Sequence, residues 1–137
     1  MVNAIKDVRS NDHGATWAVA SWQINGKNVV LNFGGSGKGS VNEFRQALCA
    51  SKDTTSYGIL RVQQTIDKSV TVKFIFITFQ GPDLPPMAKA KISTLRGGVL
   101  QVFHPFHVEM FVDSMDEVNE DALSQRLGGM DREPSRD

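Results

Sequence analysis

The stretch SVTVKFIFITF, residues 69–79, decides the fold of this chain. Successive side chains of an extended strand point to opposite faces, and in the second half of this stretch both faces are apolar. Phe74 and Phe76 share one face, while Ile75 and Ile77 share the other. A strand that is apolar on both faces lies in the middle of a sheet covered on both sides. The stretch therefore predicts a layered α/β structure.

Two β-hairpins supply the neighbours of this strand. Residues 57–66 are β-prone and lead into it through a turn at 67–68. Closer to the start, the β-prone runs 16–22 and 27–33 flank the dipeptide Asn-Gly at 25–26, which tolerates the positive φ angles of a tight turn. Both pairs are local, so each is expected to form an antiparallel hairpin.

Helices are expected in the connections. One begins at Ser40, which forms a capping box with Glu43, and runs to about residue 50. The longest spans 86–104, because apolar side chains recur there at helical spacing until Pro105 stops it. Two glycines at 97–98 each cost about 1 kcal/mol relative to alanine, so we expect a bend or close packing at that point.

The end of the chain adds one strand and one helix. Residues 107–112 form a short strand, and Ser114 with Glu117 makes a capping box that opens a helix ending at residue 127. A strand reached through a helical crossover lies parallel to its neighbour. We therefore predict a three-layer α/β domain over residues 1–127, with a mixed sheet of five or six strands between helices. Residues 128–137 are expected to be a disordered tail.

Composition excludes several classes of function. Fifteen basic residues balance fifteen acidic ones, so no net charge attracts a nucleic acid over distance, and no nucleic-acid partner is expected. No stretch approaches the roughly 18 apolar residues of a membrane helix, so we expect a protein that does not span a membrane. Cys49 is the only cysteine, which favours a reducing compartment such as the cytoplasm.

The order and spacing of these segments resemble the actin-depolymerising-factor homology (ADF/cofilin) family, and most closely its coactosin group. The resemblance covers residues 5–129. It rests on WAVAS (17–21), EF (43–44), GILRV (58–62), VKF with IT (72–74 and 77–78), AK (90–91), EMFVDS (109–114) and the acidic last helix before Gly-Gly (128–129). No one of these motifs is diagnostic alone.

The resemblance implies both a fold and a function. The fold would be the gelsolin-like three-layer fold of that family. The function would be the binding of filamentous actin without strong severing, as a monomeric regulator of actin dynamics associated with the cytoskeleton. The family has no catalytic residues, so we expect no enzyme activity, no cofactor and no metal.

Lys73 is the first candidate for the binding site. Strand alternation places its side chain on the face of Ile75 and Ile77, at the strand end, where its ammonium group should emerge at the rim of the sheet. The resemblance implies that a basic residue here is important for filament binding. Lys68, at the hairpin tip, and Arg61 would extend the patch more weakly. The second basic residue of the coactosin pattern is replaced by Thr71.

The longest helix supplies the other candidates. Lys89, Ser93 and Arg96 follow one another at helical spacing on one flank, and Lys91 lies on the same helix. In the family this helix enters a cleft on the actin surface. The two groups together predict one continuous basic rim, running from the end of the strand along the neighbouring helix.

Three alternatives stay open. A cofilin-like regulator would bind monomeric actin or the branching machinery, and phosphoinositides could bind the same lysines. The glycine-rich segment GGSGKGS, residues 34–40, would suit a nucleotide-using enzyme, because glycines and a lysine before a helix resemble a phosphate-binding loop. It fails the P-loop pattern, since Gly39 follows Lys38 where Ser or Thr is required and Asn32 stands at the first glycine position. We favour a flexible strand-to-helix connection.

Overall fold

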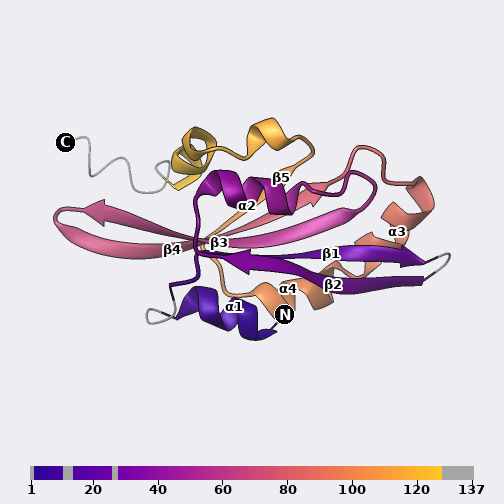
Figure 1. The fold of residues 1–137 in the computed structure, drawn as a ribbon, viewed down its shortest axis with the longest axis horizontal. Coiled ribbons are helices and arrows are strands. Elements are labelled where there is room, and N and C mark those ends of the chain that lie inside the picture. Colours follow the sequence, from indigo (N-terminus) through magenta and orange to yellow (C-terminus); the bar gives the residue numbers. More distant parts are fainter. Residues whose placement is uncertain (1, 11–13, 26–27, 128–137) are drawn as a thin grey trace.

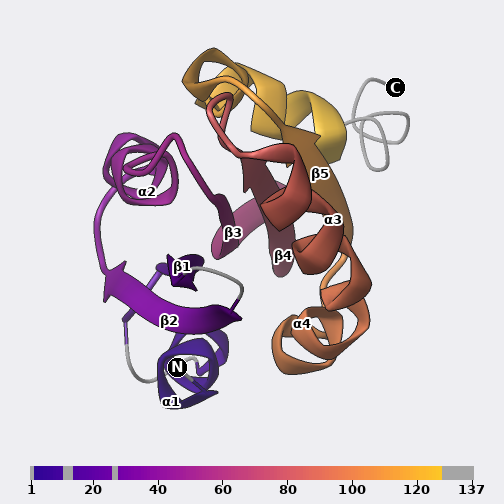
Figure 2. The same ribbon diagram turned by 90° about the vertical axis from the view of Figure 1, so that its right-hand side faces the viewer.

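A five-stranded sheet lies at the centre of the protein, between two layers of helices (Figures 1 and 2). The computed structural model describes residues 2–10, 14–25 and 28–127. The strand order is β2-β1-β3-β4-β5, with one parallel pair, β4 with β5, in an otherwise antiparallel sheet. The predicted three-layer α/β fold with a mixed sheet is confirmed. The tail predicted over 128–137 lies outside the described residues.

Both predicted hairpins are present, with longer strands than expected. The turn between β3 and β4 is formed by Asp67 and Lys68, whose φ angles of 50° and 68° are those of a tight hairpin turn. The predicted last strand pairs in parallel with β4. The strands are β1 (Trp17–Asn25), β2 (Asn28–Gly37), β3 (Thr55–Ile66), β4 (Ser69–Gln80) and β5 (Val108–Val112).

The helices form the two outer layers. Figure 2 shows α2 and the last helical segment on one side of the sheet, and α1 and α4 on the other. None of the helices in the described part of the chain is long and apolar enough to cross a bilayer. The helices are α1 (Val2–Arg9), α2 (Val41–Leu48), α3 (Pro86–Thr94), α4 (Arg96–Phe103), a 3₁₀ turn (Met115–Glu117) and residues 120–127.

The core is divided by the sheet into two clusters, as the central stretch predicts. Ile75, Ile77 and Phe79 of β4 face α2 and the last helical segment. Phe76, on the opposite face of the same strand, packs with α1, α3 and α4, and its ring lies 5.0 Å from that of Phe103. Burying both faces of β4 removes a large apolar area from water and fixes which side chains point to each layer.

The predicted long helix is broken, at a different place from the one expected. The break is at Leu95, where the backbone leaves helical geometry and the N–H bonds to the Ile92 carbonyl three residues back. Gly97 and Gly98 lie inside α4, and a Cβ atom at either position would meet nothing within 4 Å. The predicted bend or close packing at these glycines is therefore wrong.

α2 begins directly after Ser40, as predicted, whereas the helix predicted from Ser114 begins only at residue 120. Ser114 and Glu117 form the predicted capping box, but it opens only the 3₁₀ turn. A separate helix follows from residue 120, where Asn119 accepts a hydrogen bond from the Ala122 N–H. The box predicted at Ser40 is wrong, because its side chain makes no cap hydrogen bond.

The glycine-rich segment is largely a strand, which corrects the predicted flexible connection. β2 continues to Gly37, with a bulge where Val19 pairs with Gly35 and Ala20 with Phe33. A Cβ atom at Gly37 would lie 2.6 Å from the Trp17 ring and 2.3 Å from the Glu43 carboxylate. These glycines thus let the chain pass close to other groups, and a carboxylate lies where a phosphate loop would need positive charge.

Gly58 should be the glycine that tolerates substitution least well among those facing α2. A Cβ atom there would lie 2.6 Å from the Phe44 ring, which is fully buried. We expect Gly58→Ala to lower the free energy of unfolding by about 1–3 kcal/mol through overpacking. Gly97→Ala is the matched control: it should raise stability by up to about 1 kcal/mol, since α4 offers open space there. Urea unfolding of both variants tests this, and equal effects would contradict it.

Candidate functional site

A two-stranded arm projects from one end of the sheet (Figure 1). β1 pairs with β3 only over residues 56–60, and β5 pairs with β4 only over residues 75–79. Beyond these paired parts, residues 62–73 form the rest of the β3–β4 hairpin and pair only with one another. We call this segment the arm. Among the described residues, its strands have neither a neighbouring strand nor a covering helix layer on most of their length.

Lys73 lies at the base of the arm, where the sequence predicted it. It is half-buried, pairs across the hairpin with Val62, and shares the face of Ile75 and Ile77. Within the described residues, no side chain forms a hydrogen bond or an ion pair with its ammonium group that could neutralise it. Lys68 is exposed in the turn at the tip of the arm.

Arg61, which adjoins the arm, is engaged inside the molecule. Its guanidinium group donates hydrogen bonds of 3.1 Å to the carbonyls of Val8 and Arg9 at the end of α1, and it lies 5.8 Å from the centre of the Phe74 ring. Arg9 in turn donates to the carbonyls of Phe103 and Pro105, where α4 ends. Arg61 thus holds the end of α1 to the sheet, and Arg9 holds the end of α4 to α1. The weak extension of the basic patch predicted at Arg61 is therefore wrong.

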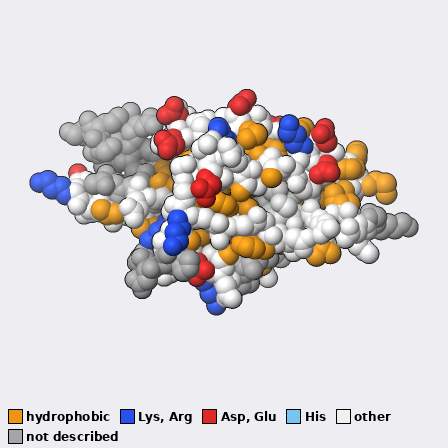
Figure 3. Space-filling model, in the orientation of Figure 1, with side chains coloured by type: hydrophobic (Ala, Val, Ile, Leu, Met, Phe, Trp, Pro, Cys, Tyr) orange, Lys and Arg blue, Asp and Glu red, His pale blue; other side chains and the backbone are white. Residues whose placement is uncertain are grey.

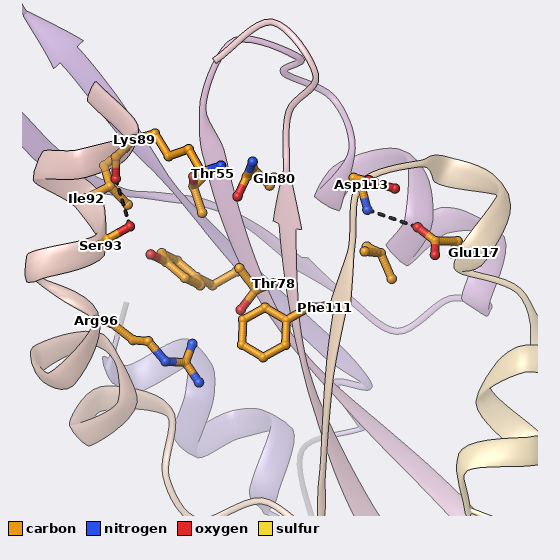
Figure 4. Close-up of a pocket in the computed structure, with 12 residues that line it drawn as sticks. Thr55, Thr78, Gln80, Lys89, Ile92, Ser93, Arg96, Phe111, Asp113 and Glu117 are labelled. Atoms are coloured by element: carbon orange, nitrogen blue, oxygen red, sulfur yellow. Dashed lines mark hydrogen bonds between the residues drawn. The ribbon is translucent and has the colours of Figure 1, made fainter. Parts of the chain in front are cut away.

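A groove of about 320 Å³ lies at the other end of the sheet, between α3 and the ends of β4 and β5 (Figure 4). We call it the α3 groove. Lys89, Ser93 and Arg96 line its helical side, so the structure brings these three predicted residues together. Across from them lie side chains that were not predicted to be part of a binding site: Thr55, Tyr57, Thr78, Gln80, Phe111, Val112 and Asp113, with Glu117 at the margin.

Arg96 and Lys89, the two cations that line the α3 groove, differ in whether their charge is compensated. Arg96 forms a salt bridge with Glu109 and lies 4.7 Å from the centre of the Phe111 ring, so its charge is compensated and its side chain is fixed. Ser93 donates its hydroxyl to the Lys89 carbonyl at 2.9 Å, and Figure 4 shows the Lys89 side chain reaching across the groove. Lys91 is exposed and is not among the groove residues.

The floor of the α3 groove is polar. The Tyr57 hydroxyl accepts a 2.9 Å hydrogen bond from the Trp22 indole N–H, and burial raises the pKa of Tyr57, so the phenol stays neutral. Thr78 is only 7% exposed, and its hydroxyl has no hydrogen-bond partner among the described residues. A buried hydroxyl without a hydrogen-bond partner costs free energy of folding.

The arm and the α3 groove are separate sites, so the predicted continuous basic rim is wrong. Lys73 and Thr78 are five residues apart in β4 and therefore point to opposite faces of the sheet, roughly 17 Å apart along the strand. On the face in Figure 3, the Lys and Arg side chains stand apart with acidic groups between them. Lys68 and Lys73 thus lie on the arm, Lys89, Ser93 and Arg96 line the α3 groove, and Lys91 belongs to neither surface.

Phe111 is the groove residue that the sequence could have revealed. Val108, Met110 and Val112 are buried on one face of β5, and this alternation leaves Glu109 and Phe111 on the other. Phe111 is 62% exposed, which is unusual for so large an apolar side chain. Thr55 and Gln80 carried no comparable signal, because they face each other only through the register of β3 and β4.

Glu117 closes the acidic end of the α3 groove. Its carboxylate accepts hydrogen bonds from the N–H groups of Asp113 and Ser114, at 2.9 and 3.2 Å. The bond from the Asp113 backbone is the main reason why the pKa of Glu117 lies below its ordinary value of 4.5. The carboxylate therefore fixes the chain that links β5 to the 3₁₀ turn.

The family model and the curated relatives that match this chain agree on one family. Residues 1–128 match the family described as cofilin/tropomyosin-type actin-binding protein. Coactosin from Dictyostelium discoideum is 29% identical over 124 residues, which are 90% of this chain and 82% of that protein. Coactosin from Entamoeba histolytica is 32% identical over 99 residues, which are 69% of this chain and 66% of the relative.

Solved structures agree with these sequence relationships. The crystal structure of coactosin from Entamoeba histolytica superposes with a TM-score of 0.84 at 25% identity, covering 96% of this chain and 94% of that one. The solution structure of mouse coactosin, described as an actin filament binding protein, has a TM-score of 0.67 at 24% identity, covering 91% and 83% of the two chains.

The lowered pKa of Glu117 predicts a pH-dependent contribution to stability. A carboxyl group whose pKa is lower in the folded state stabilises the fold above its unfolded pKa, and this stabilisation is lost as the pH falls through the folded pKa. We expect Glu117→Gln to melt at a lower temperature than the wild type near neutral pH, and the difference to shrink below about pH 4. Thermal unfolding across this range measures it.

The matched control is Glu120→Gln, an exposed carboxylate at the start of the last helix. Its melting temperature should follow that of the wild type at every pH. If the melting temperatures of Glu117→Gln and the wild type differed by the same amount from neutral to acid pH, the lowered pKa of Glu117 would be contradicted.

Proposed function

The chain belongs to the cofilin/tropomyosin-type actin-binding protein family, and we propose that it binds the side of actin filaments through the arm and the α3 groove. The observation that carries the proposal is Lys73, a cation at the base of an uncovered arm without a compensating partner among the described residues. We expect this cation to meet an acidic surface of filamentous actin. A lysine in this position can steer that encounter and hold its register.

The separation of the two sites favours a filament over a monomer. The arm and the α3 groove lie at opposite ends of the sheet and on opposite faces of β4. A single globular partner reaches both only by wrapping around the protein, whereas two neighbouring subunits of a polymer can each take one site. Two modest contacts to one polymer reinforce each other, because the second forms within an already bound complex.

The α3 groove suits a deeper contact than the arm does. Phe111 offers an exposed aromatic surface held by Arg96, and the Thr78 hydroxyl below it lacks a described partner. Binding energy in protein interfaces concentrates on aromatic and arginine side chains in pockets, while exposed charges mainly set association rate and salt dependence. We therefore assign affinity to the groove, with Lys89, Lys91 and Ser93 around it, and steering to Lys73 and Lys68.

We further propose how this binding is used. Residues 1–127 act as one ADF-homology domain that decorates filaments without strong severing and without enzymatic activity, as a cytoplasmic, cytoskeleton-associated regulator. Phosphoinositides remain candidate competitors for the exposed lysines of the arm. Binding of monomeric actin is the second candidate function, because the α3 groove alone could hold a single subunit.

Replacing Lys73 should weaken filament binding while leaving the fold intact. We expect Lys73→Ala to lower the affinity roughly fivefold, or by about 1 kcal/mol, since a partly exposed charge pair contributes about that much. The loss should diminish as salt is raised. Co-sedimentation with filamentous actin at two salt concentrations measures both, with the melting temperature as a check on folding.

The matched control is Lys6→Ala, which removes an exposed lysine from α1, across the sheet from Lys73. It should pellet with filaments as the wild type does. Undiminished pelleting of Lys73→Ala would remove the arm from the site, and wild-type protein that stays in the supernatant at low salt would reject filament binding altogether.

The two sites should be separable by their partners. We expect Lys89→Ala to weaken binding to both monomeric and filamentous actin, and Lys73→Ala to weaken binding to filaments only. The two effects on filament affinity should add in the double variant to within about 0.5 kcal/mol, because the sites share no contact. Fluorescence titration with monomeric actin and co-sedimentation test this. An equal loss of monomer binding in both variants would favour a single combined site.

A further inference from the structure

β2 is an edge strand whose outer side has no pairing partner among the described residues. β2 is the last strand of the sheet on its side, and among the described residues no strand pairs with its outer edge (Figures 1 and 2). The bulge at Gly34 divides it, which leaves residues 28–33 (NVVLNF) as a regular segment. An open edge of this kind presents a row of backbone N–H and C=O groups that can pair with another strand.

Up to the bulge, the segment lacks the charges and prolines that usually keep an edge strand from pairing. Residues 28–33 contain no charged residue, no proline and no glycine. Val30 and Phe33 are 49% and 48% exposed, so each face of the strand presents a large apolar side chain to solvent. Six-residue segments with high β-propensity and no charge are those that pair with copies of themselves.

The opposite edge of the same sheet is guarded. β5 is only five residues long, and its carbonyl at Glu109 accepts a 2.6 Å hydrogen bond from the Arg126 side chain. The Glu109 carboxylate is also held in a salt bridge by Arg96. Short length and inward-turned charges both discourage strand addition. The difference between the two edges points to β2 as the one available for pairing.

We propose that the edge of β2 pairs antiparallel with the same edge of a second copy of this chain. Around a two-fold axis a strand meets itself, so every donor and every exposed apolar side chain finds an equivalent partner. A second copy is favoured over a charged peptide because the edge has no charge to attract one, and two uncharged edges do not repel each other. The two sheets would join into one continuous sheet.

The resulting dimer is weak and depends on concentration. Pairing a segment of this length buries less than the roughly 1,200 Å² typical of stable complexes. The dimer differs from the monomer that the family resemblance implies. It would also carry two arms, which lie away from the β2 edge and remain free. Its existence does not depend on actin binding, so the test below is independent of the proposed function.

Sedimentation equilibrium of the full chain tests the proposal. We expect the average mass of the wild type to rise toward twice the monomer mass as its concentration approaches about 1 mM, whereas Val30→Lys should stay at the monomer mass. A lysine on the edge would bring two like charges together at the interface. Val70→Lys is the matched control, because Val70 is 65% exposed on the arm, and it should associate as the wild type does.

Hydrogen exchange of the wild type gives a second measurement that needs no variant. Amides within residues 28–33 should exchange several-fold more slowly at high than at low protein concentration, while those of β5 should not change. A wild type that remains monomeric at about 1 mM overturns the proposal. So does a Val30→Lys variant that folds and associates like the wild type, or concentration-dependent protection that lies outside β2.

Discussion

The pairing of β3 with β4 is the constraint on which the rest of the structure depends. The two strands are hydrogen-bonded over their whole length, from Thr55 with Gln80 to Ile66 with Ser69. β1 and β5 attach only to the half nearer Gln80, so this half becomes the centre of the sheet and the other half becomes the arm. A slip of one residue would turn every side chain of β4 to the opposite face. One register therefore sets both the core and the position of Lys73.

The alternation of side chains along β4 also explains why there are two candidate sites. Lys73 belongs to the face covered further along by α2, while Thr78 belongs to the face against which α3 packs. A single strand thus contributes to two surfaces that no one flat partner can touch at the same time. The proposed binding to a filament uses this arrangement, because neighbouring subunits of a polymer can each contact one of the two surfaces.

Local patterns of the sequence predicted the parts of the fold that local interactions determine. The two-faced apolar run predicted the central strand, and Ser114 with Glu117 predicted a cap that is present. The break at Leu95 escaped prediction because the helical spacing of apolar residues continues through it. The glycines of β2 were wrongly predicted to form a loop. Glycine is needed at Gly37 because the Trp17 ring lies against it, and strand pairing brings that ring there.

The candidate site was predictable to the same extent. Lys73 followed from alternation within one strand, but the merging of its surface with that of Lys89 was an assumption about distance that no sequence pattern supports. The partners of Arg61 lie more than 50 residues away in the chain, at the end of α1. Only the tertiary structure could show that this cation is engaged internally.

The arginines and the lysines discussed above have different roles in the structure. Arg9 and Arg61 hold backbone carbonyls, and Arg96 holds Glu109, which are tasks for the planar, multiply donating guanidinium group. Lys68, by contrast, is exposed and Lys73 half-buried, and neither ammonium group forms a hydrogen bond or an ion pair with a described residue. Acetylation acts on amines and removes their charge, but it leaves guanidinium groups alone. Enzymatic acetylation of Lys68 and Lys73 would therefore remove their positive charge. The contacts that arginine side chains make within the fold would stay unchanged.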